Sequence, residues 1–233
     1  MRLPATDGKA KTGRQIGENG MARRKYIVGN WKMNGSLAAL AELDAIAAQA
    51  TDAAATVAVC PPATLIAPAV GRQPDLIIGG QDCHWNVSGA HTGCLSPQML
   101  AEAGARMVIV GHSERRTDNG ETNEDVRKKA EAALAAGLIT ILCVGETRAE
   151  REGGWAIATV ERQLEESLPA PQHLDRLIIA YEPVWAIGTG LTPTVADVAE
   201  MHGTIRGFLE ARYGDAGAGM SILYGGSVNG DNA

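Results

Sequence analysis

The chain has 233 residues, 45% hydrophobic and 21% charged, an ordinary composition for a globular protein with one sizeable core. Its formal net charge of −6 argues against a nucleic-acid partner, because phosphate backbones favour basic surfaces. Four cysteines without CxxC spacing, and no apolar run long enough for a membrane helix, favour a cytoplasmic protein with reduced thiols and no membrane partner.

The first 20 residues are polar and glycine-rich, and they lack the apolar segment of a secretory signal. Met21, followed by ARRKYIVGN, looks like a second and more natural start. We therefore predict that residues 1–20 form a disordered N-terminal extension, with a transit peptide as the alternative. Residues 21–233 are predicted to form a single domain.

Seven short and nearly continuous apolar runs recur after Met21. Such runs are typical of parallel strands that are buried on both faces. They are YIVGN from Tyr26, TVAVC from Thr56, LIIGG from Leu76, MVIVG from Met107, ITILCVG from Ile139, LIIAYE from Leu177 and SILYGG from Ser221.

Most gaps between these runs contain helical patterns. Three helices are predicted: one capped by Ser36, one that runs from a cap at Asn123 to Gly137, and one that begins at Thr192-Pro193. The residues expected to face inward are Leu37, Leu40, Leu43 and Ile46 in the first helix and Val195, Val198, Ile205 and Phe208 in the third.

Strand and helix alternate seven times without a linker that would separate two domains. This pattern predicts an α/β fold, and it favours a closed TIM (β/α)8 barrel over an open doubly wound sheet. Such a barrel needs eight strands, whereas the chain ends at Ala233, just after the seventh. We therefore expect a barrel truncated after its seventh strand, either because the sequence is part of a longer protein or because the eighth unit is missing.

Polar residues follow four of the predicted strands, at the face where such barrels carry their sites. The first strand leads into Asn30-Trp31-Lys32 and the fourth into His112-Ser113-Glu114. The sixth ends in Glu182, and the seventh leads into Gly225-Gly226-Ser227. An amide, an ammonium, an imidazole, a carboxylate and a glycine-rich anion cradle therefore converge on one rim. This set is suited to moving a proton next to a carbonyl group in a phosphorylated substrate.

Five segments, in order GNWKMNG, GHSERR, CVGE, AYEPVWAIGTG and YGGSV, resemble the triosephosphate isomerase family from about Tyr26 to Ala233. The resemblance implies an aldose–ketose isomerase of glycolysis and gluconeogenesis. It would interconvert dihydroxyacetone phosphate and D-glyceraldehyde 3-phosphate through an enediol(ate), and it would need neither a cofactor nor a metal.

The resemblance assigns catalytic roles to four residues. Glu182 would be the base that removes a carbon-bound proton and returns it to the neighbouring carbon. His112 would donate to the substrate oxygen as a neutral ring, because a helix N-terminus disfavours a positive imidazole. Lys32 would bind the phosphate dianion and stabilise the developing oxyanion, and Asn30 would donate to the substrate as well.

The resemblance also implies a lid after the base and further residues around the site. The predicted lid and hinge residues are Pro183, Val184, Trp185, Ala186, Ile187 and Gly190. Closure would exclude water, bring the amide of Gly188 to the phosphate, and suppress elimination to methylglyoxal. Ser227 would bind the same phosphate. Ser113 would be the resting partner of Glu182 and Glu114 the partner of Lys32, while Tyr181 and Glu146 would support the lid.

The segment Gln81–Leu95 resembles the loop that joins two subunits of the family. A homodimer follows by analogy, with Thr92 reaching the partner's site. Two positions depart from the family pattern, because Cys94 replaces a usual glutamate and His91 a usual aromatic ring. That glutamate normally pairs with the arginine that corresponds to Arg115, so the interface would be weaker or Arg115 would find another partner. An exposed ion pair contributes only ~0–1 kcal/mol, so we still expect dimers.

Two other interpretations stay open on the sequence alone. The chain could be an inactive or incompletely folded barrel fragment that needs the missing C-terminal unit. Lys32 could instead form a Schiff base, as in an aldolase. A metal site is not expected, because the five histidines are dispersed and lack acidic partners at ligand spacing.

Overall fold

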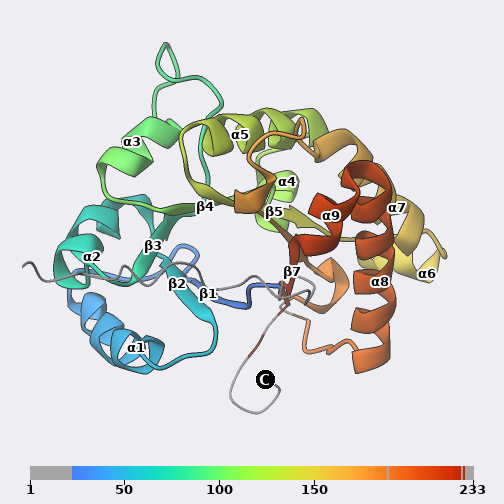
Figure 1. Ribbon diagram of the computed structural model, residues 1–233, viewed down its shortest axis with the longest axis horizontal. Helices are drawn as coiled ribbons and strands as arrows, with labels where there is room; N and C mark the ends of the chain where they lie inside the picture. The colour runs from blue at the N-terminus through green and yellow to red at the C-terminus, as the bar shows by residue number, and fades with distance from the viewer. Residues whose placement is uncertain (1–22, 188, 227, 229–233) are drawn as a thin grey trace, which may run out of the picture.

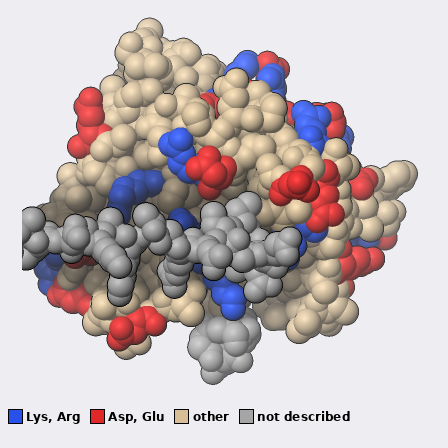
Figure 2. Space-filling view, viewed as in Figure 1, with Lys and Arg blue, Asp and Glu red and all other residues tan. Residues whose placement is uncertain are grey.

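The computed structural model describes residues 23–187, 189–226 and 228. The predicted N-terminal extension and two predicted phosphate-binding residues, Gly188 and Ser227, lie outside the described residues. None of the helices in the described part of the chain is long and apolar enough to cross a membrane. Acidic and basic side chains are interspersed over the face seen in Figure 2, in keeping with the modest net charge of −6.

In the described part of the chain, seven parallel strands form one sheet, in which each strand pairs with the next one in the sequence. They are β1 (Tyr26–Asn30), β2 (Thr56–Cys60), β3 (Ile77–Gly80), β4 (Met107–Val110), β5 (Ile139–Val144), β6 (Leu177–Tyr181) and β7 (Ser221–Tyr224). Every one lies within the apolar run that predicted it.

The sheet curves into a nearly closed barrel, and the helices lie outside it (Figure 1). The first and last strands approach each other at their N-terminal ends. There the Ser221 hydroxyl donates to the Arg24 carbonyl at 2.6 Å, and Arg23 Nε donates to the Ala218 carbonyl at 2.9 Å. The prediction of a parallel α/β barrel is therefore confirmed.

Helices cover the outside of the barrel, one or two after most strands. They are α1 (Glu42–Ala50), α2 (Ile66–Arg72), α3 (Pro97–Glu102), α4 (Ser113–Asp118), α5 (Asn123–Ala135), α6 (Arg148–Glu152), α7 (Ala156–Ser167), α8 (Val195–Tyr213) and α9 (Asp215–Gly219). Short 3-10 turns lie at η1 (Ala38–Ala41), η2 (Ala63–Leu65), η3 (Leu174–Arg176) and η4 (Val184–Ala186).

Two predicted helix starts are wrong by one or two residues. The N-cap of α5 is Thr122 rather than Asn123, because the Thr122 hydroxyl accepts from the Asp125 amide while the Asp125 carboxylate accepts from the Thr122 amide. The same capping box places the N-cap of α8 at Thr194 rather than at Thr192-Pro193. A Thr-x-x-Asp pair satisfies two unpaired helix-start amides at once, so it stabilises the helix start more than a neighbouring residue that can satisfy only one amide.

Two residues predicted to face inward are instead exposed, Leu37 at 68% and Val195 at 88%. Each lies at the start of its helix, before the first residue that reaches the core. Ser36, the predicted cap, precedes η1, where its hydroxyl accepts a hydrogen bond from the Ala39 amide at 3.4 Å.

Apolar side chains pack in two layers, one inside the barrel and one between the strands and the helices. The inner layer consists of Ala58, Cys60, Met107, Ile109, Ile141, Cys143, Ile178 and Ala180. Successive residues of a strand point to opposite faces, so the strand that sends Ala180 inward also directs Glu182, two residues later, to the inside of the barrel mouth. Strand alternation thus places the Glu182 carboxylate above the apolar inner layer of the barrel.

Candidate active site

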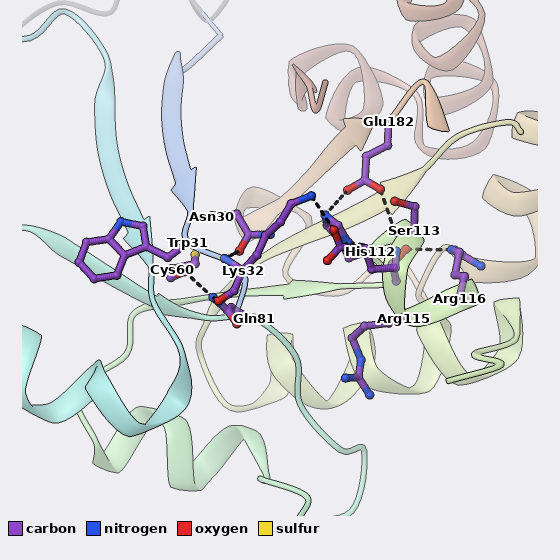
Figure 3. Close-up of polar contacts among 12 residues, drawn as sticks. Asn30, Trp31, Lys32, Cys60, Gln81, His112, Ser113, Arg115, Arg116 and Glu182 are labelled. Carbon is purple, nitrogen blue, oxygen red and sulfur yellow. Dashed lines mark hydrogen bonds and ion pairs between the residues drawn. The ribbon is translucent and has the colours of Figure 1, made fainter. Parts of the chain in front are cut away.

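A cavity of about 680 Å³ opens at the carboxyl ends of the strands and extends along the seam between β1 and β7. Four predicted catalytic residues line it, namely Asn30, Lys32, His112 and Glu182. The structure therefore brings together side chains that are far apart in the sequence and that come from the ends of β1, β4 and β6 (Figure 3).

Glu182 is held at the mouth of the barrel and is only 4% exposed. Its amide donates to the Val144 carbonyl at 2.8 Å, which continues the pairing of β6 with β5 by one residue. Its Oε2 accepts a hydrogen bond from the Ser113 amide at 2.9 Å, and its Oε1 lies 3.4 Å from His112 Nε2. The contact of Ser113 with Glu182 is thus made through its backbone amide.

His112 is the N-cap of α4, and the Glu114 amide donates to its Nδ1 at 3.2 Å. An amide N–H can only donate, so Nδ1 must be unprotonated in this arrangement. The ring proton then sits on Nε2, the nitrogen that faces Glu182 (Figure 3). The imidazole is therefore neutral and presents a hydrogen-bond donor toward the carboxylate.

Lys32 has a left-handed backbone conformation with φ of +51°. Such a conformation costs a non-glycine residue about 1–2 kcal/mol, so neighbouring groups must hold it in place. Its amide donates to Asn30 Oδ1 at 2.9 Å, and its Nζ pairs with Glu114 Oε1 at 2.6 Å. Since Oδ1 is engaged by this amide, the Nδ2 group of Asn30 is the part that can donate to a ligand.

The side chain of Gln81 holds the strained backbone of Lys32. Its amide group donates to the Lys32 carbonyl at 2.8 Å and to the Cys60 carbonyl at 2.9 Å (Figure 3). The sequence predicted Gln81 only as part of the dimer loop and not as a contact of Lys32. A polar side chain directly after the apolar strand β3 was the available signal.

Gly145, in the CVGE segment, permits the close approach of β5 to Glu182. A Cβ atom at this position would lie 1.7 Å from the Glu182 carbonyl oxygen. Gln163 fixes the glycine by accepting from its amide at 2.8 Å and donating to its carbonyl at 2.9 Å. Any larger residue here would displace the backbone of the carboxylate.

The thiol of Cys143 lies in the cavity beneath Glu182. Burial, and next the neighbouring Glu182 carboxylate, raise the pKa of Cys143 well above its usual range. The thiol is therefore neutral at physiological pH and adds no second negative charge below the carboxylate.

The predicted lid segment follows Glu182 directly. Pro183 and Ala186 are buried, Val184 to Ala186 form η4, and Ile187 lines the cavity. The Thr189 hydroxyl donates to the Trp185 carbonyl at 2.9 Å, and Gly190 has a φ of +78°.

Glu146 supports the start of this segment. Its Oε1 accepts from Trp185 Nε1 at 2.8 Å and from the Tyr181 hydroxyl at 3.0 Å. Burial, and then the Glu146 carboxylate, raise the pKa of Tyr181 above its ordinary value, so the hydroxyl stays a donor.

The segment Gln81–Leu95 projects from the barrel between β3 and α3 (Figure 1). Thr92 and Cys94 are exposed on it, and His91 stacks on His84 with ring centroids 4.0 Å apart. Arg115 pairs with carboxylates of its own chain.

These partners form a compact ion network at the base of the projecting segment. Arg115 pairs with Asp82 at 3.0 Å and with Glu121. Lys129, which is buried, pairs with Asp82 at 2.7 Å and with Glu121 at 2.6 Å.

In the part of the chain that the structure describes, no group of three or more His, Cys, Asp or Glu side chains is arranged to hold a metal ion.

Comparisons with known proteins agree on one family. The family model described as triosephosphate isomerase matches residues 25–233. The triosephosphate isomerase of Ruegeria sp. (strain TM1040) is 53% identical over 210 residues, which cover 90% of this chain and 85% of that protein. The triosephosphate isomerase of Afipia carboxidovorans is 56% identical over 214 residues, with the same coverage. A crystal structure of triosephosphate isomerase from Bartonella henselae superposes with a TM-score of 0.82 and 46% identity, covering 88% of this chain and 84% of that one.

Replacement of Gln81 tests whether it holds Lys32 in place for anion binding. Gln81→Met keeps a similar volume but removes both donors, so we expect inorganic phosphate to bind about tenfold more weakly, as for the loss of one to two hydrogen bonds. Isothermal titration with phosphate measures this. Gln172→Glu, on an exposed loop, is the control and should bind as the parent chain does. Unchanged phosphate affinity in Gln81→Met would remove Gln81 from this role.

Proposed function

The chain belongs to the triosephosphate isomerase family, and from that premise we propose how its own residues interconvert dihydroxyacetone phosphate and D-glyceraldehyde 3-phosphate. One observation carries the proposal. The buried Glu182 carboxylate and the Nε2 of His112 lie 3.4 Å apart at the mouth of a cavity that Lys32 also lines. A base, a neutral donor and a cation therefore face one space.

Glu182 acts as the base. It removes a proton from the carbon next to the substrate carbonyl, and the electron pair of that C–H bond moves toward the carbonyl oxygen. His112 donates from Nε2 to this oxygen and stabilises the enediol(ate). The carboxylic acid of Glu182 then returns the proton to the former carbonyl carbon. The hydroxyl proton of the carbon that was deprotonated passes, by way of His112 Nε2, to the former carbonyl oxygen, so the carbonyl group forms on the other carbon and the isomerisation is complete. The Ser113 amide holds the resting carboxylate between turnovers.

Lys32 supplies positive charge against the negative net charge of the chain. It binds the phosphate and, with the Nδ2 group of Asn30, stabilises the oxyanion, a contribution of about 3–4 kcal/mol for a preorganised donor. Gly188 and Ser227 complete the phosphate site in this proposal. The Lys32 Nζ is engaged by Glu114 Oε1 at 2.6 Å, which supports an electrostatic role for this side chain over the alternative Schiff-base chemistry.

The segment from Pro183 to Gly190 acts as a lid in this proposal. Its first residues already pack over the cavity, since Ile187 lines it and Ala186 is buried. Closure excludes water from the enediolate and so strengthens the contacts of Lys32 and His112 with it. Closure also holds the phosphate away from the geometry that leads to elimination.

We further propose a cytoplasmic, glycolytic enzyme that forms a homodimer through the segment Gln81–Leu95. The projection of this segment from the barrel supports the dimer, as does the exposure of Thr92 on it. Thr92 would reach the partner's site near Asn30 and Lys32.

Shortening the base by one methylene tests the role of Glu182. Glu182→Asp withdraws the carboxylate from the substrate carbon, so we expect kcat to fall about a thousandfold with little change in KM, as when a general base is lost. A coupled isomerase assay measures both constants. Glu152→Asp, on exposed α6, is the matched control and should leave kcat unchanged. Equal effects of Glu182→Asp on kcat and KM would contradict the assignment.

The reactivity of Cys94 tests the dimer. Burial raises the pKa of Cys60 and of Cys83 to about 12 and that of Cys143 well above its usual range, so the exposed Cys94 is the thiol expected to react. If the segment Gln81–Leu95 is covered in a dimer, alkylation of Cys94 by iodoacetamide slows as the chain concentration rises. Sedimentation on the same samples gives the mass. A constant rate with a monomer mass throughout would refute the dimer.

A further inference from the structure

Arg151, in α6, makes three contacts with its guanidinium group. Its Nη1 donates to Glu146 Oε1 at 3.1 Å, and its Nη2 pairs with Asp197 Oδ1. The planar group also lies over the ring of Trp185, 4.6 Å from the centroid. Arginine is suited to such a position, because its flat fork can stack on an aromatic face and form two directional ion pairs at once.

Two of these contacts lie on either side of the lid segment, one near its start and one just beyond its end. Trp185 belongs to η4, near the start of the segment. Asp197 lies in the first turn of α8, the helix that follows the segment, and completes its capping box by accepting from the Thr194 amide at 2.8 Å and from the Thr194 hydroxyl at 2.7 Å. These hydrogen bonds, and next the charge of Arg151, lower the pKa of Asp197, so the carboxylate is ionised at neutral pH. One side chain from α6 therefore links both ends of the segment.

The third contact of Arg151 is with the carboxyl group of Glu146. Glu146 is fully buried, and its Oε2 has no hydrogen-bond partner among the described residues. Its Oε1 accepts from Arg151, from Tyr181 and from Trp185. A buried carboxyl group is costly without a cationic partner, so Arg151 stabilises the Glu146 side chain that accepts from the Trp185 indole.

We infer that Arg151 is a positioning residue for isomerisation, which joins the two ends of the lid segment and fixes its start through Trp185 and Glu146. This inference rests on the proposed function of that segment. It goes beyond the sequence analysis, in which Arg151 had no role. Arg151 does not line the cavity, so it acts through Trp185 and Asp197.

The inference predicts a particular failure when Arg151 is lost. With both ends of the segment released, the enediolate is less often covered. In the uncovered enediolate phosphate, the C–O bond to phosphate breaks, and the electron pair leaves with inorganic phosphate. The remaining enol rearranges to methylglyoxal. A rise in the ratio of methylglyoxal to isomerised product is therefore a readout that a merely structural role would not move.

The experiment compares Arg151→Met with Arg148→Met. Both arginines lie in α6, but Arg148 pairs with Glu152 at 2.7 Å on the solvent side and is 67% exposed. We expect Arg151→Met to lower kcat about tenfold and to raise the elimination ratio about as much, as for the loss of a partly buried cation–π contact and ion pair. Arg148→Met should leave both unchanged.

Two further variants apply if Arg151→Met folds poorly in thermal melting. Asp197→Asn removes the charge that Arg151 pairs with but keeps a side-chain oxygen that can accept from the Thr194 amide. Arg151→Lys keeps a cation near Glu146 but cannot bridge both ends. We expect each to raise the elimination ratio by a smaller factor than Arg151→Met. If every variant folds and gives the same ratio of methylglyoxal to isomerised product as Arg148→Met, the inference is overturned.

A spectroscopic measurement keeps the test independent of turnover. The chain contains four tryptophans, and labelling with 5-fluorotryptophan gives a fluorine resonance for each, with that of Trp185 assigned by Trp185→Phe. We expect Arg151→Met to move or broaden the Trp185 resonance and Arg148→Met to leave it in place. If the parent chain shows no isomerase turnover, the proposed function fails, and this spectrum alone decides on Arg151. An unchanged Trp185 resonance in Arg151→Met would overturn the inference.

Discussion

Two successive backbone amides at the start of α4 organise the site. The Ser113 amide donates to Glu182 Oε2, and the Glu114 amide donates to His112 Nδ1. The first amides of a helix lack partners within the helix, so they are available to hold other groups. One turn of backbone therefore orients the base, sets the tautomer of the imidazole and keeps the two groups 3.4 Å apart. The acid–base chemistry proposed for this chain depends on that turn.

The rest of the barrel positions and stabilises the groups of this site. Strand alternation sends Glu182 inward above the apolar inner layer, and Gly145 leaves room for its backbone. Lys32 follows β1, and its strained backbone is stabilised by the side chain of Gln81, which follows β3. Behind the lid segment, Glu146 and Arg151 hold Trp185. Each reactive side chain is thus held by a neighbour that takes no part in the chemistry.

The sequence predicted the strands and the strand-end residues of the site, because runs buried on both faces have a simple pattern and Glu182 directly follows one. It misplaced the starts of α5 and α8, because a Thr-x-x-Asp box competes with other caps at neighbouring positions. The contacts of Gln81 with Lys32 and of Arg151 with Asp197 join residues far apart in the sequence. The position of Gln81 directly after β3 was a signal for a strand-end residue, but no local pattern identified the partner of either side chain.

The protonation of His112 tests the account most directly. Nitrogen NMR of the chain labelled with ¹⁵N-histidine, with His112 assigned by His112→Gln, reports which ring nitrogens carry protons, both alone and with glycerol 3-phosphate. At neutral pH the account predicts a neutral His112 ring with its proton on Nε2 and an unprotonated Nδ1 in both samples. A proton on Nδ1, alone or together with one on Nε2, would contradict the hydrogen bond from Glu114 and with it the proposed roles of His112 and Glu182.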